Sequence, residues 1–195
     1  ADAASVPTAL TTSARCAVSG TPRTGKHSGF KKNAYLYPIE DPAMEPVLNE
    51  HNKEEYPPMH TAEHILNATM VRLFGCPRSR NAHIERKKSK CDYLLSEAPT
   101  PEQVAMIEEQ VNEVIRRNLP VTVEYVPRAE AAEIVDLSKL PEDVSDTLRI
   151  VRVGDYDACA CIGAHVGNTS EIGAFKILSH DFEDGRWRVR WKVLQ

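Results

Sequence analysis

The sequence lacks any long apolar run. None of its hydrophobic stretches approaches the ~20 residues needed to span a bilayer, so we do not expect a membrane protein. Cysteine is sparse as well: the five cysteines are scattered and odd in number. That usage is typical of a reducing compartment and not of a small secreted scaffold. The start of the chain has no hydrophobic segment of a secretory signal. We therefore expect a cytoplasmic protein, although the basic, Ser/Thr/Ala-rich residues 1–33 leave an organelle-targeting segment open.

An excess of one charge is also missing. The net charge is −4, and 42% hydrophobic with 27% charged residues is ordinary for a globular protein. This composition excludes no partner, because nucleic-acid binding depends on local basic patches. We find no internal repeat, and 195 residues suffice for one domain with a sizeable core and an appendage.

The chain divides by composition near residue 56. Residues 1–56 are predicted to form an N-terminal arm or extension that is partly irregular, with a loop over 1–33 and one short strand over 33–41. Residues 42–58 contain four prolines and several acids, which favours a linker or a draped segment. Residues 57–195 carry regular periodic patterns and are predicted to be the functional domain.

Those patterns predict an α+β fold with a mainly antiparallel sheet packed with helices. Helices are expected over 60–74, where Gly75 is the stop signal, and after Thr100, where Gln103 can complete a capping box. A short helix is expected over 128–135. Strands are predicted at 120–126 and 148–154, and residues 81–96 fit two strands joined by a basic turn. The runs 174–182 and 186–194, separated by Glu-Asp-Gly, predict a hairpin whose second strand is a half-buried sheet edge.

Two histidines open the first predicted helix, in "HTAEHIL". His60 and His64 are four residues apart, so a helix stacks both imidazoles on one face. Cys161 and His165 repeat this spacing in "CIGAH". Imidazole and thiolate are the ligands that zinc prefers, and two pairs would complete a tetrahedral shell. Cys159 shares a face with Cys161 on an extended segment, so geometry alone leaves either thiol open.

A peptidase is the rival interpretation of the first pair. His60-Thr-Ala-Glu63-His64 fits the pattern H-x-x-E-H, in which the glutamate acts as general base of a zinc peptidase. The third ligand would be a carboxylate from the second predicted helix, which offers Glu108, Glu109 and Glu113. This interpretation leaves the Cys161–His165 pair unexplained, and the chain is short for such an enzyme.

The stretches "HTAEHIL" and "CIGAHVGNTSEIGAFKI" together resemble the H-x-x-x-H and C-x-x-x-H motifs of the editing domain of alanyl- and threonyl-tRNA synthetases. Freestanding alanyl-tRNA editing proteins are similar to that domain, and the resemblance runs from about Pro57 to Gln195. It implies that the catalytic and metal-site residues are His60, His64, Cys161 and His165, with Zn²⁺ as cofactor. It also implies hydrolysis, in trans, of the ester bond of mischarged tRNA, with Ser- or Gly-tRNA(Ala) as first-choice substrate.

The departures from the motif keep alternatives open. Ile162 and Ala164 stand where alanyl-type members usually have Gly and Thr, so Ser-tRNA(Thr) is a second candidate substrate. Four protein ligands describe a closed, structural zinc site, so a non-enzymatic module that binds RNA or a protein is a further alternative. We find no ATP-binding or amino-acid-activating region, and ATP is not expected to be a ligand.

The expected partner is the acceptor end of tRNA. Residues 71–90 contain seven basic residues against Glu85 alone. Such a stretch can meet RNA phosphates. The residues named as tRNA-binding are Arg86, Lys87, Lys88 and Lys90. The oligomeric state is not predicted.

Overall fold

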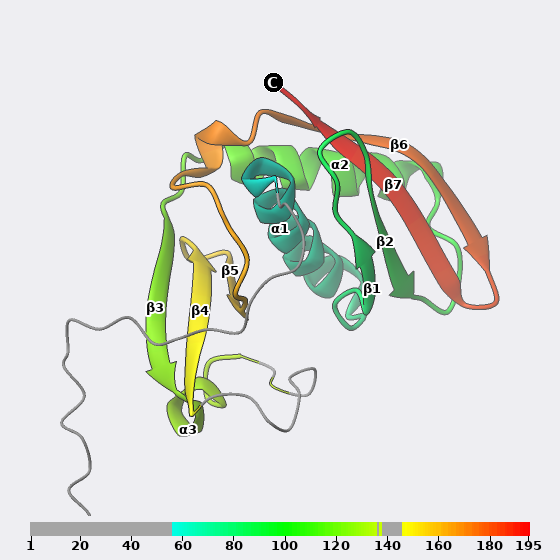
Figure 1. The fold of residues 1–195 in the computed structure, drawn as a ribbon. Coiled ribbons are helices and arrows are strands. Elements are labelled where there is room, and N and C mark those ends of the chain that lie inside the picture. Colours follow the sequence, from blue (N-terminus) through cyan, green and yellow to red (C-terminus); the bar gives the residue numbers. More distant parts are fainter. Residues whose placement is uncertain (1–55, 136, 138–145) are drawn as a thin grey trace, which may run out of the picture. The chain divides into compact units, whose positions relative to one another are not determined.

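The computed structural model of the protein describes residues 56–135, 137 and 146–195, all within the unit Met44–Gln195 (Figure 1). The loop, the strand at 33–41 and nearly all of the linker predicted for the N-terminal extension lie outside these residues. The described part contains helices and two antiparallel sheets. The predicted α+β class is therefore confirmed.

Helix α1 (Pro57–Phe74) is the central element and lies between the two sheets (Figure 1). Two prolines occupy its first turn, where a missing N–H costs nothing, so it starts three residues earlier than predicted. It ends as predicted at Gly75, whose φ of 62° is left-handed. Almost every residue from Pro58 to Met70 is buried. None of the described helices is long and apolar enough to cross a lipid bilayer.

Helix α2 (Pro101–Arg116) begins with the predicted capping box: the Thr100 side chain accepts from the Gln103 N–H at 3.3 Å, and the Gln103 side chain accepts from the Thr100 N–H at 2.8 Å. The helix packs on α1 and along strand β6 (Ala174–Glu183). Asn112 makes hydrogen bonds to both main-chain polar groups of Phe175, at 2.8 and 2.9 Å. Side chains of α2 thus take the place of a neighbouring strand along the start of β6.

The four-stranded sheet has the order β1-β2-β7-β6, with β1 at Asn81–His83, β2 at Ser89–Leu94 and β7 at Arg186–Leu194. The predicted hairpins β1–β2 and β6–β7 are both present. The prediction that residues 186–194 form a sheet edge is wrong, because β7 pairs with β2 on one side and β6 on the other. Trp187, Val189 and Trp191 point inward and are fully buried, whereas the arginines between them point outward. Alternation within one strand cannot reveal a partner almost a hundred residues away.

The three-stranded sheet has the order β3-β4-β5, with β3 at Val121–Pro127, β4 at Thr147–Val153 and β5 at Asp157–Ala160. The short helix expected over 128–135 is a single turn, α3 (Arg128–Ala131). Strand β5 was not predicted, since four residues are too few to show an alternating pattern. This strand matters because it leads directly into Cys161.

Candidate metal centre

The two histidine-containing motifs meet where the start of α1 packs against the end of β5. His60 and His64 come from the first two turns of α1, and Cys161 and His165 come from the turn after β5. One nitrogen or sulfur atom from each of these four residues lies within 4.8 Å of all the others. The structure thus brings together the four residues that the spacing paired.

The spacing of these atoms suits a tetrahedral ion. The Cys161 Sγ lies 3.4 Å from Nε2 of His60 and 3.5 Å from Nε2 of His165. Around zinc, metal–sulfur and metal–nitrogen bonds of about 2.3 and 2.0–2.1 Å at a tetrahedral angle separate sulfur from nitrogen by roughly 3.6 Å. The four residues can therefore hold a metal ion. His64 is buried, whereas His60, Cys161 and His165 are half-buried, so the centre borders solvent on their side.

The two cysteines that sequence spacing left open have different surroundings. Burial alone would raise the pKa of Cys161, but its contacts with the imidazole rings of His165, His60 and His64 lower it to about 3. Burial raises the pKa of Cys159, whose Sγ donates to the Ala160 carbonyl at 3.6 Å. Cys161 is thus the thiolate of the cluster and Cys159 is a neutral neighbour.

Thr61 sets the orientation of His165. Its hydroxyl donates to the Pro57 carbonyl at 3.0 Å, and a hydroxyl has only one proton to donate. The same oxygen must therefore accept from the Val166 N–H at 3.2 Å and from Nδ1 of His165 at 3.1 Å. A proton on Nδ1 leaves the lone pair on Nε2 free for a ligand. Burial and the neighbouring cationic rings lower the pKa of His165 to about 4, which keeps this imidazole neutral.

Asp157 lies behind His64 as Thr61 lies behind His165. Its Oδ2 lies 3.3 Å from Nδ1 of His64, at ion-pair distance. Burial alone would lower the pKa of His64, but the carboxylate of Asp157 and the thiolate of Cys161 raise it to about 10. Arg78 holds both oxygens of Asp157, at 2.6 and 3.2 Å. A carboxylate behind a ligating histidine fixes its ring and makes it a stronger ligand.

Arg149 fixes the turn that carries the other two ligands. Its Nη1 donates to the carbonyls of Cys161 and Gly163, at 2.7 and 2.9 Å, and its own carbonyl accepts from the Cys161 N–H at 3.0 Å. Sequence reasoning missed Thr61, Arg149 and Asp157. The only signals were local, namely Thr61 directly after His60 and Asp157 four residues before Cys161.

The carboxylates required by the peptidase interpretation are engaged elsewhere. Glu63 accepts a hydrogen bond from Asn67 on the next turn of α1. Glu108 binds Lys176 at 2.7 Å, and Glu109 and Glu113 both bind Arg116. None of these four glutamates belongs to the cluster of potential ligands. None of the glutamates that the peptidase interpretation requires is thus placed, among the described residues, as a third ligand beside the histidine pair.

The basic residues of 71–90 separate into two groups. Arg72, although exposed, packs over the Tyr156 ring, 4.1 Å from its centroid, and the half-buried Arg78 pairs with Asp157, so both are engaged by groups of the protein itself. The residues predicted to contact tRNA lie in the β1–β2 turn and at the start of β2: Arg86, Lys87 and Lys88 are exposed and Lys90 is half-buried.

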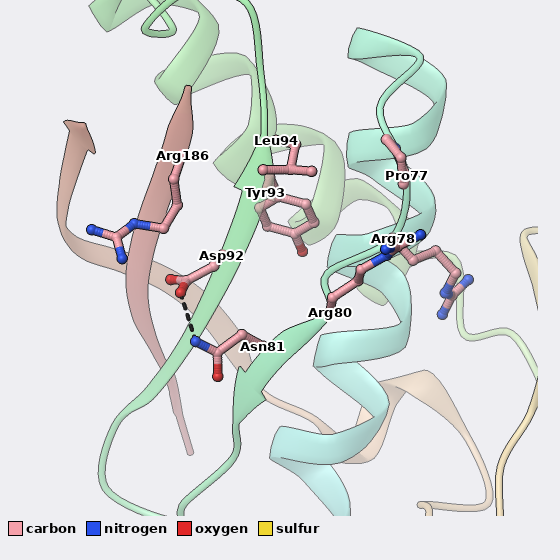
Figure 2. A pocket seen from close by; sticks show the side chains of 8 residues that line it. All are labelled: Pro77, Arg78, Arg80, Asn81, Asp92, Tyr93, Leu94 and Arg186. Atoms are coloured by element: carbon pink, nitrogen blue, oxygen red, sulfur yellow. Dashed lines mark hydrogen bonds between the residues drawn. The ribbon is translucent and has the colours of Figure 1, made fainter. Parts of the chain in front are cut away.

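A pocket of about 240 Å³ lies beside the far part of β2, with Arg186 on one side and Arg78 and Arg80 on the other (Figure 2). Its carboxylate, Asp92, accepts from Asn81 at 2.9 Å. None of the four candidate ligands lines this pocket. It is therefore a separate feature and not the mouth of the metal centre.

Comparison with known proteins agrees with this geometry. Residues 148–190, which include Cys161 and His165, match the family model described as the second additional domain of threonyl and alanyl tRNA synthetases. The alanine–tRNA ligases of Bacillus subtilis and Fervidobacterium nodosum are each 36% identical over 121 residues, 62% of this chain. That of Idiomarina loihiensis is 31% identical over 166 residues, 83% of this chain.

A stretch that covers 83% of this chain must include all of α1, so this similarity takes in His60 and His64 as well as Cys161. The chain carries an alanyl-tRNA-synthetase-like editing domain. It spans only 14% of the length of the Bacillus and Fervidobacterium ligases and 19% of the Idiomarina ligase. The same alignment also extends into the segment before Pro57, because residues 57–195 alone are less than 83% of the chain.

Proposed function

We propose that this editing-like domain hydrolyses, in trans, the ester bond between a wrong amino acid and its tRNA. The observation that carries the proposal is the convergence of three imidazoles and one thiolate, with sulfur–nitrogen distances of 3.4 and 3.5 Å. Similarity to alanine–tRNA ligases favours Ser- or Gly-tRNA(Ala) as substrate over Ser-tRNA(Thr).

His60, His64, Cys161 and His165 would hold Zn²⁺, which supplies a Lewis acid for the ester carbonyl and makes a bound water more acidic. The protein's own groups prepare this site before substrate arrives. Thr61 directs Nε2 of His165 inward, and Asp157 holds His64. The half-buried positions of His60 and Cys161 leave one side of the centre accessible to an aminoacyl group.

The proposed reaction compensates for the limited selectivity of small amino-acid-binding pockets. A site built for alanine cannot reject serine or glycine strongly, because one hydroxyl or methyl group changes binding by only ~1–3 kcal/mol. A second site that hydrolyses the wrong product restores accuracy. Such a site needs the ester and the acceptor end together, which is why an RNA-binding surface should adjoin it.

The basic turn between β1 and β2 lies where such an RNA-binding surface is needed. The Arg86 guanidinium lies 5.0 Å from the centroid of the Tyr56 ring, and the Tyr56 carbonyl accepts from the His60 N–H at 3.1 Å. Figure 1 shows the turn between β1 and β2 at the same end of the domain as the start of α1. Arg86, Lys87, Lys88 and Lys90 can thus bind phosphates beside the metal centre.

The test is hydrolysis of preformed Ser-tRNA(Ala), Gly-tRNA(Ala) and Ser-tRNA(Thr) by the full chain, with and without a chelator. We expect the alanine-tRNA esters to be cleaved, and activity to be lost with the chelator and restored by Zn²⁺. Replacing the four basic residues by glutamine should weaken tRNA binding and leave the turnover of bound substrate nearly unchanged. Absence of hydrolysis on all three substrates in the Zn²⁺-loaded protein would reject the proposal.

A structural zinc in a non-enzymatic RNA- or protein-binding module is the second candidate, and the number of four protein ligands favours it. The two candidate functions differ in whether the metal ion stabilises only the fold or also takes part in catalysis. In the non-enzymatic case the chelator lowers the free energy of unfolding, and no ester is cleaved at any metal concentration. The half-buried positions of three of the four ligands favour the enzyme.

A further inference from the structure

We infer that the outer face of the four-stranded sheet, at its end nearest the basic turn, forms a second part of the RNA-binding surface. This inference rests on the proposed function and deepens it. The basic face consists of Lys90 on β2, Arg190 and Lys192 on β7, and Lys176 on β6. Of these residues, only Lys90 belongs to the basic stretch 71–90.

The strand register brings these cations together. Lys90 lies directly opposite Arg190 in the β2–β7 ladder, and Lys192 lies directly opposite Lys176 in the β6–β7 ladder. Side chains alternate along a strand, and the neighbours Val189 and Trp191 point into the core. All four cations therefore share the solvent side. Like charges directly opposite each other destabilise a sheet, so cross-strand pairing does not explain Lys90 opposite Arg190 or Lys192 opposite Lys176.

At the other end of the sheet, both outward-facing arginines of β7 are paired with carboxylates. There Asp92 binds Arg188 through two hydrogen bonds of 2.7 Å, and Glu183 binds Arg186 at 2.9 Å. On the basic face, Arg190 pairs with Asp181 at 2.6 Å and Lys176 with Glu108 at 2.7 Å. Lys90 and Lys192 have no carboxylate partner among residues 56–135, 137 and 146–195. The positive charge is therefore concentrated at one end of the sheet.

That end adjoins the metal centre. Strand β2 starts directly after the basic turn, and the last residues of β7 reach the start of α1. The Val193 N–H lies 3.3 Å from the sulfur of Met59, and the Tyr56 hydroxyl donates to Gln195 at 2.6 Å. In Figure 1 the end of β7, the β1–β2 turn and the start of α1 lie at the same end of the domain. A nucleic acid on the basic face would continue onto the turn and towards His60.

The chemistry of the face fits the phosphates of an RNA duplex. Lysine acts as a point charge for phosphate. Single-stranded RNA is held largely by bases stacked on aromatic side chains. Here both tryptophans of β7, Trp187 and Trp191, are fully buried on the opposite side of the sheet. The described residues of the face therefore offer charge without an exposed tryptophan for stacking, as the stem of a tRNA acceptor arm would require.

The experiment measures binding of an uncharged acceptor-stem RNA hairpin to the full chain over a range of salt concentrations. Replacing Lys192 by glutamine should weaken binding several-fold and reduce the salt slope by about one, because one phosphate contact is lost. Lys192→Arg should keep the slope. Arg186→Gln is the matched control, since it removes one cation from the same strand and face but from the neutralised end, and it should bind like the wild type.

An unchanged slope in Lys192→Gln, or an equal loss in Arg186→Gln, would overturn the inference. Equal weakening on a single-stranded RNA of the same length would overturn its assignment to a duplex. Because the hairpin carries no amino acid, the result is independent of hydrolysis. A chain that binds as expected but cleaves no ester would reject only the proposed function, and a deacylase with an unchanged slope would reject only this surface.

Discussion

Thr61 and His165 are 104 residues apart in the chain, yet the Thr61 hydroxyl lies 3.1 Å from Nδ1 of His165. One side chain of the histidine helix thus orients a candidate ligand of the other motif. The two motifs therefore form a single preorganised unit, and the residues behind the ligands become the sharpest targets for mutation.

Replacing Thr61 by valine should weaken zinc binding by about 10- to 100-fold, the usual cost of losing a group that orients a ligand. Valine keeps the shape of threonine but cannot accept the proton of Nδ1. Thr61→Ser should restore most of the affinity because it retains the hydroxyl. Competition with a chromophoric chelator measures both variants. Wild-type affinity in Thr61→Val would show that His165 needs no such partner.

The Arg78–Asp157 pair is expected to contribute to stability and to metal binding separately. Arg78→Met leaves a buried carboxylate without its main partner and should lower the free energy of unfolding by about 3 kcal/mol; the Asp157 side chain is only 5% exposed. Adding Asp157→Asn should recover much of that loss, since the amide leaves no buried carboxylate without Arg78. Urea unfolding measures both variants.

Zinc affinity should stay about 10- to 100-fold low in this double variant, because the carboxylate behind His64 is gone. Chelator competition on the same protein measures it. If the double variant bound zinc like the wild type, Asp157 would have only a structural role.

Glu63 distinguishes the editing reaction from the peptidase interpretation. A general base contributes about 10²- to 10⁴-fold to a rate, whereas Glu63 here bonds to Asn67 and lies outside the cluster. Glu63→Gln should therefore keep most of the deacylase activity, and Cys161→Ala should lose it. Cys159→Ala is the control for the thiol and should be mild. An inactive Glu63→Gln beside an active Cys161→Ala would reverse these roles.

The ion pair between Asp92 and Arg188 should make stability depend on pH. Hydrogen bonds from Arg188 lower the pKa of Asp92, against the effect of burial. The carboxylate therefore stabilises the fold above its unfolded pKa of about 3.9, and this contribution is lost as the pH falls through the lower folded-state pKa. Asp92→Asn should cost about 2 kcal/mol at pH 7.

The wild-type and Asp92→Asn urea midpoints should converge as the solution is acidified below about pH 4, where the wild type loses this contribution. Unfolding in urea at a series of pH values measures the difference. A gap that stayed constant with pH would mean that the aspartate acts through its shape and not its charge.

Two glycines with positive φ should respond differently to alanine. A Cβ at Gly173, where φ is +85°, would lie 2.2 Å from the Leu194 carbonyl oxygen, whereas a Cβ at Gly75 would meet nothing within 4 Å. Gly75→Ala should cost about 1–2 kcal/mol from its left-handed backbone alone. Gly173→Ala should cost clearly more, because β7 must also move. Equal unfolding midpoints for the two variants would contradict this contact.

The sequence by itself determined the local elements and the pairing of candidate ligands within each motif. Helix α1 followed from its periodicity and Gly75, α2 from Thr100 and Gln103, and the hairpins from alternation around short turns. These features depend on residues a few positions apart, where backbone geometry leaves few choices. The same reason places His60 beside His64 on one helical face.

Only the tertiary structure decided what depends on contacts between distant segments. It placed β7 in the middle of its sheet, took Arg72 and Arg78 out of the basic stretch, and put Thr61 and Asp157 behind the ligands. It also placed Cys161, which the C-x-x-x-H motif had indicated, and not Cys159, among the three imidazoles, where its pKa is low. Each of these outcomes depends on burial and on contacts between residues that are far apart in the chain. Such contacts leave no periodic pattern in the sequence from which they could be predicted.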